Sequence, residues 1–128
     1  HMKFYRCNKC GQMVGIVRKT NIPMICCGED MEEIIPYTKE DGVGEKHIPV
    51  YKLRNGRLTV NIGSIPHPMT SDHYIEWVAI VTSKGNQRKC LKPGDAPVVT
   101  FLLEKDETLK EIFAYCNIHS LWLKEADR

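Results

Sequence analysis

The sequence Leu58-Thr59-Val60-Asn61-Ile62 alternates strictly between apolar and polar side chains. Such alternation is typical of a β-strand with one face in a core and the other in solvent. Denser apolar or β-branched runs at Ile75–Val81 and Val98–Leu103 predict strands inside a sheet, and Val50–Leu53 and Gln87–Leu91 predict shorter strands. The sequence therefore predicts a mainly β fold.

Turn-forming residues separate these strands. They lie at Arg54-Asn55-Gly56, Ser83-Lys84-Gly85-Asn86 and Lys92-Pro93-Gly94-Asp95. Several short strands with turns at this spacing indicate an antiparallel β-sandwich. The one candidate helix is Asp106–Tyr115, because its apolar side chains at 109, 112 and 113 have helical spacing.

The chain divides into two blocks of different composition. Residues 1–37 are rich in cysteine and glycine and too few to bury a core unaided, so this block needs a metal, disulfides or a partner chain. Residues 38–44 are polar, contain two glycines and are predicted as a linker, and residues 45–128 carry the predicted sandwich. His1-Met2 has the form of a tag remnant before an initiator methionine, so His1 is excluded from any site.

Composition and charge narrow the functional class. Of 128 residues, 42% are hydrophobic and 27% charged, which describes a folded chain. The net charge of +2 is spread evenly, so nucleic acid is not an expected partner. No apolar run approaches the roughly 20 residues that span a bilayer, so no membrane partner is expected either. Without a secretory signal, a cytoplasmic location is expected, and the six cysteines are predicted to be reduced metal ligands.

Four cysteines form a candidate all-sulfur metal site. Cys7 and Cys10 are separated by two residues, and the adjacent pair Cys26-Cys27 follows after a short loop, with a glycine after each pair. Four thiolates in two clusters can converge into a tetrahedral cage, which suits zinc or iron. Zinc ribbons normally place two residues between both members of each pair, so the adjacent cysteines favour iron and predict local backbone strain.

A second candidate site combines nitrogen and sulfur ligands. Apart from His1, every histidine lies in a turn-forming polar segment: His47, His67, His73 and His119. His67 is held between two prolines, which restrict its backbone, and Cys116 precedes His119 by three residues. Imidazole and thiolate are ligands for iron, copper and zinc. These five residues therefore predict a metal site.

Both constellations resemble known families. Residues 3–37 resemble desulforedoxin, a small mononuclear-iron module that dimerises. The segments Glu45–Val50, Ser64–Met69, His73–Trp77, Leu91–Pro97 and Cys116–His119 resemble the iron domain of superoxide reductase in sequence and order. Together they resemble the desulfoferrodoxin family of two-iron superoxide reductases over nearly the whole chain. One departure is Ser120, where that family commonly has glycine.

The resemblance implies a fold and two ligand sets. It implies a desulforedoxin-like four-cysteine domain followed by an immunoglobulin-like β-sandwich. One iron would be bound by Cys7, Cys10, Cys26 and Cys27, where recombinant protein could also hold zinc. A second iron would be bound by the four histidines, with Cys116 as the axial ligand and a sixth position open.

The resemblance also implies an activity, the one-electron reduction of superoxide to hydrogen peroxide. Lys46 would attract the anionic substrate and position the proton donor, and Glu45 would bind ferric iron as a sixth ligand. The first iron would act in electron transfer or in structure. Rubredoxin or a similar carrier is the implied electron donor, and a homodimer is expected.

Other interpretations stay open at this point. The chain could be a non-enzymatic iron electron carrier, an oxygen sensor, or a zinc protein whose sites are structural or hydrolytic. Cys90 belongs to neither cluster and is expected to pack as a small apolar group, with a reactive thiol or an intermolecular link as the alternative. Trp77 and Trp122 are expected to pack in the core.

Overall fold

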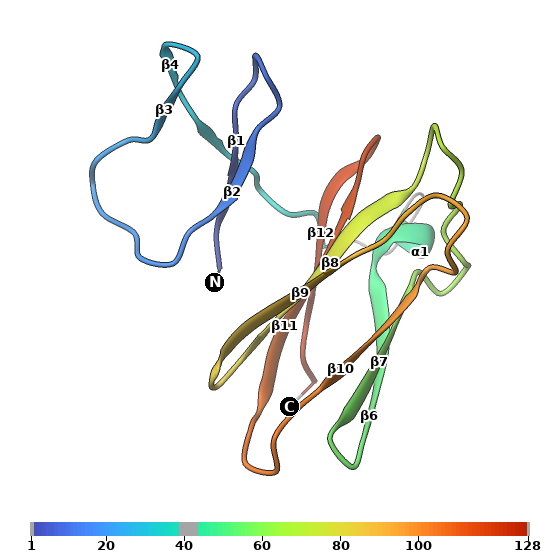
Figure 1. Ribbon diagram of the computed structural model, residues 1–128. Coiled ribbons are helices and arrows are strands. Elements are labelled where there is room, and N and C mark those ends of the chain that lie inside the picture. Colours follow the sequence, from blue (N-terminus) through green and yellow to red (C-terminus); the bar gives the residue numbers. More distant parts are fainter. Residues whose placement is uncertain (1, 39–43, 128) are drawn as a thin grey trace. The chain divides into compact units, whose positions relative to one another are not determined.

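The structure is a computed structural model that describes residues 2–38 and 44–127. It contains two compact units, residues 1–35 and 36–128. The linker predicted at residues 38–44 lies mostly outside the described residues. The helices and strands of Figure 1, in chain order, are β1 (Phe4–Arg6), β2 (Met13–Gly15), β3 (Ile25–Cys26), β4 (Glu29–Asp30), β5 (Glu32–Glu33), α1 (Gly44–His47), β6 (Pro49–Arg54), β7 (Arg57–Ile62), β8 (Ile75–Thr82), β9 (Gly85–Cys90), β10 (Val98–Leu102), β11 (Leu109–Cys116) and β12 (Ser120–Glu125).

The N-terminal unit has very little hydrophobic core. Its antiparallel sheet has the order β2-β1-β5, and β3 and β4 form a separate hairpin. Phe4 and Ile34 are buried, whereas Val17 and Ile22 are largely exposed. So small a core agrees with a unit that depends on cross-links between its loops.

The second unit is the predicted β-sandwich. One antiparallel sheet has the order β10-β7-β6 and the other the order β12-β11-β8-β9, and the two form facing layers (Figure 1). The alternation in β7 holds, since Leu58, Val60 and Ile62 are fully buried. They pack in one cluster with inward residues of β8, β10 and β11, such as Ile80 and Phe101. The mainly β, immunoglobulin-like sandwich is therefore confirmed.

The helix predicted at Asp106–Tyr115 is wrong. Residues 109–116 form β11, an inner strand between β8 and β12. Six consecutive side chains from Glu111 to Cys116 are buried, because both faces of the strand are covered. A strand buried on both faces loses the period of two, and its apolar residues then fit helical spacing as well. By contrast, β12 and the five short N-terminal strands carried no pattern that predicted them.

Two predicted features near the strands have clear outcomes. The predicted turn at Asn55-Gly56 connects β6 to β7 as a two-residue hairpin loop with both φ angles positive, 51° and 79°. Cys90 is exposed and its sulfur accepts a hydrogen bond from Arg88 Nη1 at 3.0 Å. The expectation that it packs as an apolar group is wrong, because β9 is an edge strand with little covering it.

No helix among the described residues is long and apolar enough to cross a membrane.

Gly63 is a point where only glycine fits, and it predicts a stability difference. Its φ is +85°, and a Cβ there would lie 2.6 Å from the backbone carbonyl of Lys46. Gly94 has a similar φ of +93° with open space around it, so it is a matched control. We expect Gly94→Ala to cost about 1 kcal/mol, from the left-handed backbone alone, and Gly63→Ala to cost about 3 kcal/mol or more. Urea unfolding of both variants measures this, and equal losses would contradict the close approach.

Candidate metal centres

The first candidate centre lies in the N-terminal unit. The sulfur atoms of Cys7, Cys10, Cys26 and Cys27 all lie within 4.8 Å of one another, and the Sγ atoms of Cys10 and Cys26 are 3.6 Å apart. Metal–sulfur bonds of about 2.3 Å in a tetrahedron put sulfur atoms about 3.8 Å apart. All four cysteines are free thiols. The four residues therefore fit a tetrahedral metal site.

Two tight turns bring the sulfur atoms together. After β1, the Gly11 amide donates to the Cys7 carbonyl at 3.0 Å, and the Cys10 amide points to the Cys7 sulfur at 3.5 Å. In the β3–β4 hairpin, Cys27 and Gly28 are the two loop residues, with φ of 53° and 77°. A type I′ loop requires positive φ at both positions. This explains the adjacent cysteines and confirms the predicted backbone strain at Cys27.

The four thiols cannot all ionise easily without a cation. Backbone amides of Cys10 and Lys9 lower the pKa of Cys7 to about 6. Hydrogen bonds to Cys10 and Cys7 raise the pKa of Cys26 to about 12, and the pKa of Cys27 is raised for the same reason. One thiolate thus forms readily and keeps its neighbours protonated. A bound metal ion would reverse this by pairing with every thiolate.

The second candidate centre lies at one end of the sandwich, where four imidazole rings form a square. Neighbouring ring centroids are 4.5 Å (His47–His67), 4.7 Å (His67–His73), 5.0 Å (His73–His119) and 4.8 Å (His47–His119) apart, and the His47–His73 diagonal is 6.2 Å. A ring nitrogen about 2.1 Å from a metal ion puts neighbouring centroids about 4.5 Å apart and opposite ones about 6.4 Å apart. The square matches four nitrogens around one ion.

The ring nitrogens face one another. His67 Nε2 and His47 Nε2 are 3.0 Å apart, and His67 Nδ1 lies 2.6 Å from the Pro68 carbonyl. The carbonyl fixes the proton on Nδ1, which leaves the Nε2 lone pair free for a metal. His73 Nε2 is buried with no hydrogen-bond partner. An unpartnered buried nitrogen beside two facing lone pairs is what a metal ion would satisfy.

A hairpin loop supplies the remaining donors. Cys116 pairs with Ser120 across β11 and β12, so Asn117, Ile118 and His119 form a three-residue loop. Ser120 has φ +66°, the left-handed conformation that closes such a loop and usually selects glycine. The serine therefore keeps the geometry that glycine would give. The loop puts His119 Nδ1 3.9 Å from the Cys116 sulfur.

The Cys116 sulfur lies with the histidine nitrogens. Its Sγ and the nitrogens of His47, His67 and His73 lie within 4.8 Å of one another. The thiol is fully buried, and burial raises its pKa, opposed by the backbone amides of His119 and Ile118. A buried thiol of this kind binds as thiolate only with a cation beside it. Five donors, four nitrogen and one sulfur, are thus available.

Two of the histidines, His67 and His73, are held in the neutral form that binds a metal. Burial lowers the pKa of His67 to about 4, against the opposing hydrogen bond to Pro68. Burial also lowers the pKa of His73, and the charges of His119 and Lys46 add to the effect. Neutral imidazole is the form that coordinates a metal. At neutral pH these rings need no proton removed before binding.

Two residues position the ligands in ways that the sequence did not reveal. Asn117 Oδ1 accepts from the Tyr74 amide at 2.9 Å, and its Nδ2 donates to the Asp72 carbonyl at 3.0 Å, which links the His73 loop to the Cys116 loop. Trp122 stacks on the His47 ring at 4.7 Å, and its Nε1 donates to the His119 carbonyl at 2.9 Å. Trp122 is buried as expected, but it also contacts two ligand residues.

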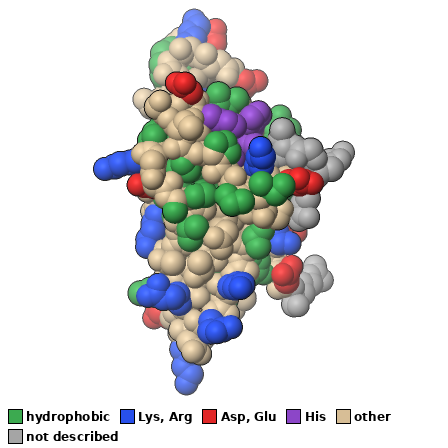
Figure 2. Space-filling model, turned by 90° about the vertical axis from the view of Figure 1, so that its right-hand side faces the viewer, with side chains coloured by type: hydrophobic (Ala, Val, Ile, Leu, Met, Phe, Trp, Pro, Cys, Tyr) green, Lys and Arg blue, Asp and Glu red, His purple; other side chains and the backbone are tan. Residues whose placement is uncertain are grey.

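Glu45 and Lys46 are exposed beside the site. They belong to α1, directly before buried His47, and the Glu45 carbonyl accepts hydrogen bonds from the Ile65 amide and the Ser64 hydroxyl. Burial is the main cause of the lowered pKa of His73, and the charge of Lys46 adds to it after that of His119. Figure 2 shows histidine side chains reaching the surface with a cationic side chain beside them. A cation is therefore present at the open side of the site.

The fold and the two donor sets define a class, a mainly β metalloprotein with two separate mononuclear centres. Comparison with known proteins agrees. Residues 39–125 match the desulfoferrodoxin family model and residues 1–34 match the model of the desulfoferrodoxin N-terminal domain. The chain belongs to the desulfoferrodoxin family, and the predicted resemblance is confirmed.

Individual relatives cover nearly the whole chain. A desulfoferrodoxin homolog of Archaeoglobus fulgidus is 39% identical over 94% of both chains. The desulfoferrodoxin of Nitratidesulfovibrio vulgaris is 36% identical over 97% of this chain and 96% of its own. The crystal structure of the superoxide reductase from Treponema pallidum has a TM-score of 0.81 at 32% identity, over 98% of both chains. The donors for two iron centres are thus in place in a chain of this family.

Trp122 gives a prediction about ligand positioning. We expect Trp122→Leu, which removes both the stack and the hydrogen bond, to weaken iron binding at the histidine centre about tenfold or more. Trp122→Phe keeps a ring and should lose less. Trp77→Leu is the control, because Trp77 is also buried but stacks on Tyr115. Chelator competition and the ferric absorption spectrum measure the effect, and equal weakening by both leucine variants would contradict a positioning role.

Proposed function

We propose that this protein is a superoxide reductase, in which superoxide takes up one electron and two protons and leaves as hydrogen peroxide. The observation that carries the proposal is the square of four imidazoles with the buried Cys116 sulfur beside it. Five donors exceed the four of a structural zinc site and suit six-coordinate iron with one position for an outside ligand. The structural neighbour from Treponema pallidum, which is named superoxide reductase, supports the same activity.

The residues of the chain divide the task between them. When bound, iron supplies the single electron, and the buried thiolate of Cys116 increases electron density at the metal. His47, His67, His73 and His119 hold the metal as neutral ligands. The cationic Lys46 at the open side attracts the anionic substrate and orients the group or water that delivers protons.

The test is the reaction of iron-loaded, pre-reduced protein with superoxide. We expect rapid appearance of ferric absorption and one peroxide per iron oxidised. An electron carrier or an oxygen sensor would give no stoichiometric peroxide, and a zinc protein would have neither iron nor visible absorption. Iron-loaded protein that gives no stoichiometric peroxide, or a histidine site that does not take up iron at all, would overturn the proposal.

The four-cysteine centre holds a second iron, in electron transfer or in structure. Tetrahedral thiolate sites suit both iron and zinc, so recombinant protein can carry zinc there. Because the N-terminal unit buries so few apolar side chains, metal binding to Cys7, Cys10, Cys26 and Cys27 also supplies folding energy.

The reductant is a small electron carrier such as rubredoxin, since every turnover consumes one electron.

The compartment is the reducing cytoplasm, because all six cysteines are free thiols and four of them form one metal site. Activity and iron in the cytoplasmic fraction of source cells would test the location. Recovery in an oxidising compartment would contradict it.

Lys46 gives a kinetic prediction. We expect Lys46→Ala to slow the reaction of reduced protein with superoxide about tenfold at low salt and to flatten its ionic-strength dependence. Lys110→Ala, an exposed lysine on β11, is the control. Pulse radiolysis over a range of salt concentrations measures both rates. An unchanged rate for Lys46→Ala would remove this residue from the mechanism.

Glu45 gives a spectroscopic prediction. As a ligand of ferric iron, its carboxylate would fill the sixth position after turnover. We expect Glu45→Ala to shift the ferric absorption band while the first step with superoxide changes less than twofold. Glu104→Ala, an exposed carboxylate beyond β10, is the control. A ferric spectrum identical to that of the unsubstituted protein would exclude Glu45 as a ligand.

We also propose a homodimer formed through the N-terminal unit. Val17 and Ile22 are 98% and 77% exposed, and Ile25 and Ile35 are also exposed on this small unit. Apolar side chains left in water here are what a second copy would cover. Sedimentation should give twice the chain mass for the unsubstituted protein and a monomer for Val17→Asp/Ile22→Asp. A monomeric unsubstituted protein at micromolar concentration would contradict the dimer.

A further inference from the structure

The outer face of the β10-β7-β6 sheet has an unusual charge. Its cross-strand rows, from the histidine end downward, are Val50–Asn61–Val98, Lys52–Thr59–Thr100 and Arg54–Arg57–Leu102. We call this surface the cationic face. It carries three cations, and β6, β7 and β10 contain no aspartate or glutamate. With a net charge of only +2 on the whole chain, this concentration of one sign is a local feature.

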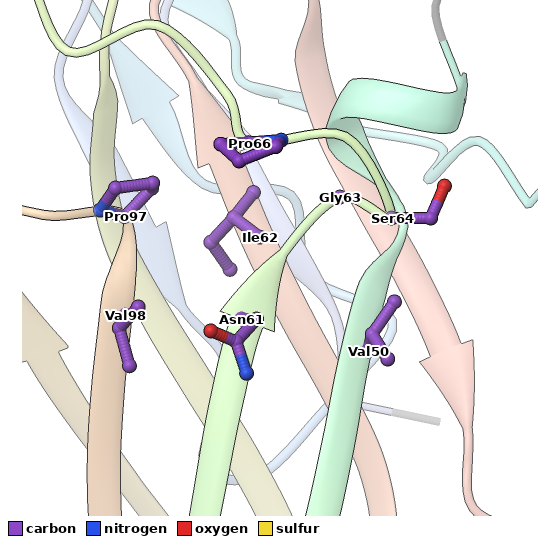
Figure 3. Close-up of a pocket in the computed structure, with 8 residues that line it drawn as sticks. All are labelled: Val50, Asn61, Ile62, Gly63, Ser64, Pro66, Pro97 and Val98. Carbon is purple, nitrogen blue, oxygen red and sulfur yellow. The ribbon is translucent and has the colours of Figure 1, made fainter.

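An apolar pocket lies at the end of the cationic face nearest the histidines. Its volume is about 330 Å³. It is lined by Val50, Asn61, Ile62, Gly63, Ser64, Pro66, Pro97 and Val98 (Figure 3). Figure 2 shows hydrophobic side chains in a band below the histidines and Lys and Arg side chains below that band. The surface thus combines an apolar centre with a cationic flank.

The pocket is one residue away from two metal ligands. Pro66 lines the pocket and directly precedes His67, whose amide donates to the Ile62 carbonyl at 3.2 Å. Gly63 lies against the Lys46 backbone, so closely that only glycine fits, and Lys46 directly precedes His47. The rings of His47 and His67 are themselves almost fully buried. An electron entering at the pocket would therefore reach a ligand through very few bonds.

We propose that the apolar pocket and the cationic face form the docking surface for a small acidic electron-carrier protein that reduces the histidine-bound iron. This inference rests on the proposed function, which requires one electron per turnover. Acidic side chains on the carrier pair with Lys52, Arg54 and Arg57, and its apolar contact residues cover the pocket. A few apolar residues with a charged flank suit the small, transient interfaces of electron-transfer partners.

A second copy of this chain does not fit the same surface. A twofold dimer through the cationic face would bring the same three cations of each copy together. Like charges in an interface are costly, and the face offers no carboxylate to relieve them. The homodimer proposed above uses the N-terminal unit instead.

The first test measures reduction of the ferric full-length protein by stopped flow, with reduced rubredoxin as the acidic probe and reduced cytochrome c as a basic one. We expect Lys52→Glu/Arg54→Glu/Arg57→Glu to slow reduction by rubredoxin at least tenfold at low salt, and less at high salt. The control Arg18→Glu/Lys110→Glu/Lys124→Glu changes the net charge equally and should change this rate less than threefold. Reduction by cytochrome c should not slow in either variant.

The outcomes separate this proposal from the proposed function. Oxidation of the pre-reduced triple variants by superoxide should stay within about twofold of the unsubstituted protein. If both triple variants slowed reduction by rubredoxin equally, the proposed docking surface would be wrong, and the proposed superoxide reduction would be unaffected. Failure of the unsubstituted protein to oxidise in superoxide would overturn the function, whatever the donor does.

The second test needs no variant. Zinc-substituted rubredoxin, added to the ¹⁵N-labelled full-length protein, should shift amide signals of Val50, Asn61, Ser64 and Val98 together with those of Lys52 and Arg57. Shifts confined to the sheet β12-β11-β8-β9 or to the N-terminal unit would overturn the proposal. So would a self-association of the protein that shifts the same signals without rubredoxin.

Discussion

The constraint on which the second unit depends is a set of nitrogen and sulfur donors gathered at one point, where a metal ion can bind to all of them. His47 and His67 turn their Nε2 atoms toward each other at 3.0 Å, and His73 Nε2 is buried without a partner. Cys116 adds a buried thiol whose ionisation burial opposes. Left alone, these groups cost folding free energy. One bound cation would offset this free energy for all the donors at once, so metal binding and folding of this end of the sandwich are coupled.

The sandwich supplies what such a site needs, a rigid base with free loops at one end. The core residues of β7, β8 and β11 are almost completely buried, and the ligands follow or precede these strands. Cys116 ends β11, and the tight loop before Ser120 presents His119. Trp122 then ties His119 and His47 together, and Asn117 ties the loop to the His73 segment. Because Trp122 and Asn117 each contact two ligand segments, fixing one ligand in place also restricts the position of another.

In both units, a bound metal ion would stabilise a cluster of donor side chains, but the two units differ in how much core surrounds that cluster. In the N-terminal unit the strands are two or three residues long. Backbone amides lower the pKa of Cys7, and hydrogen bonds to Cys10 and Cys7 raise the pKa of Cys26. There the metal replaces a core that the chain is too short to build. In the sandwich the core exists already, and the metal is placed where the core ends. The first centre is suited to stability and electron storage, the second to chemistry at a solvent-facing position.

The sequence predicted the sandwich and the nine candidate donors that the fold gathers into two clusters, because their signals are local. Alternation in residues 58–62, the prolines around His67 and the Cys116–His119 spacing are each contained in a few residues. It failed at β11, since a strand buried on both faces has no period of its own. It also missed the roles of Asn117 and Trp122, because both act on residues that the fold brings close. Contacts at long sequence separation leave no pattern in the chain.

The exposed cations of the second unit lie around the ligand cluster and not within it. His47, His67 and Cys116 are buried, and burial lowers the pKa of His67 and of His73, so before a metal binds these residues offer little charge to attract an anion from a distance. The cations that can do so lie outside this cluster: Lys46 directly before His47, and Lys52, Arg54 and Arg57 on β6 and β7. Superoxide is small and needs only the charge beside the metal, whereas a protein donor needs a broad surface with an apolar centre. In the functions proposed above, the reaction with superoxide depends on Lys46 near the iron, and the delivery of electrons depends on Lys52, Arg54 and Arg57 further away.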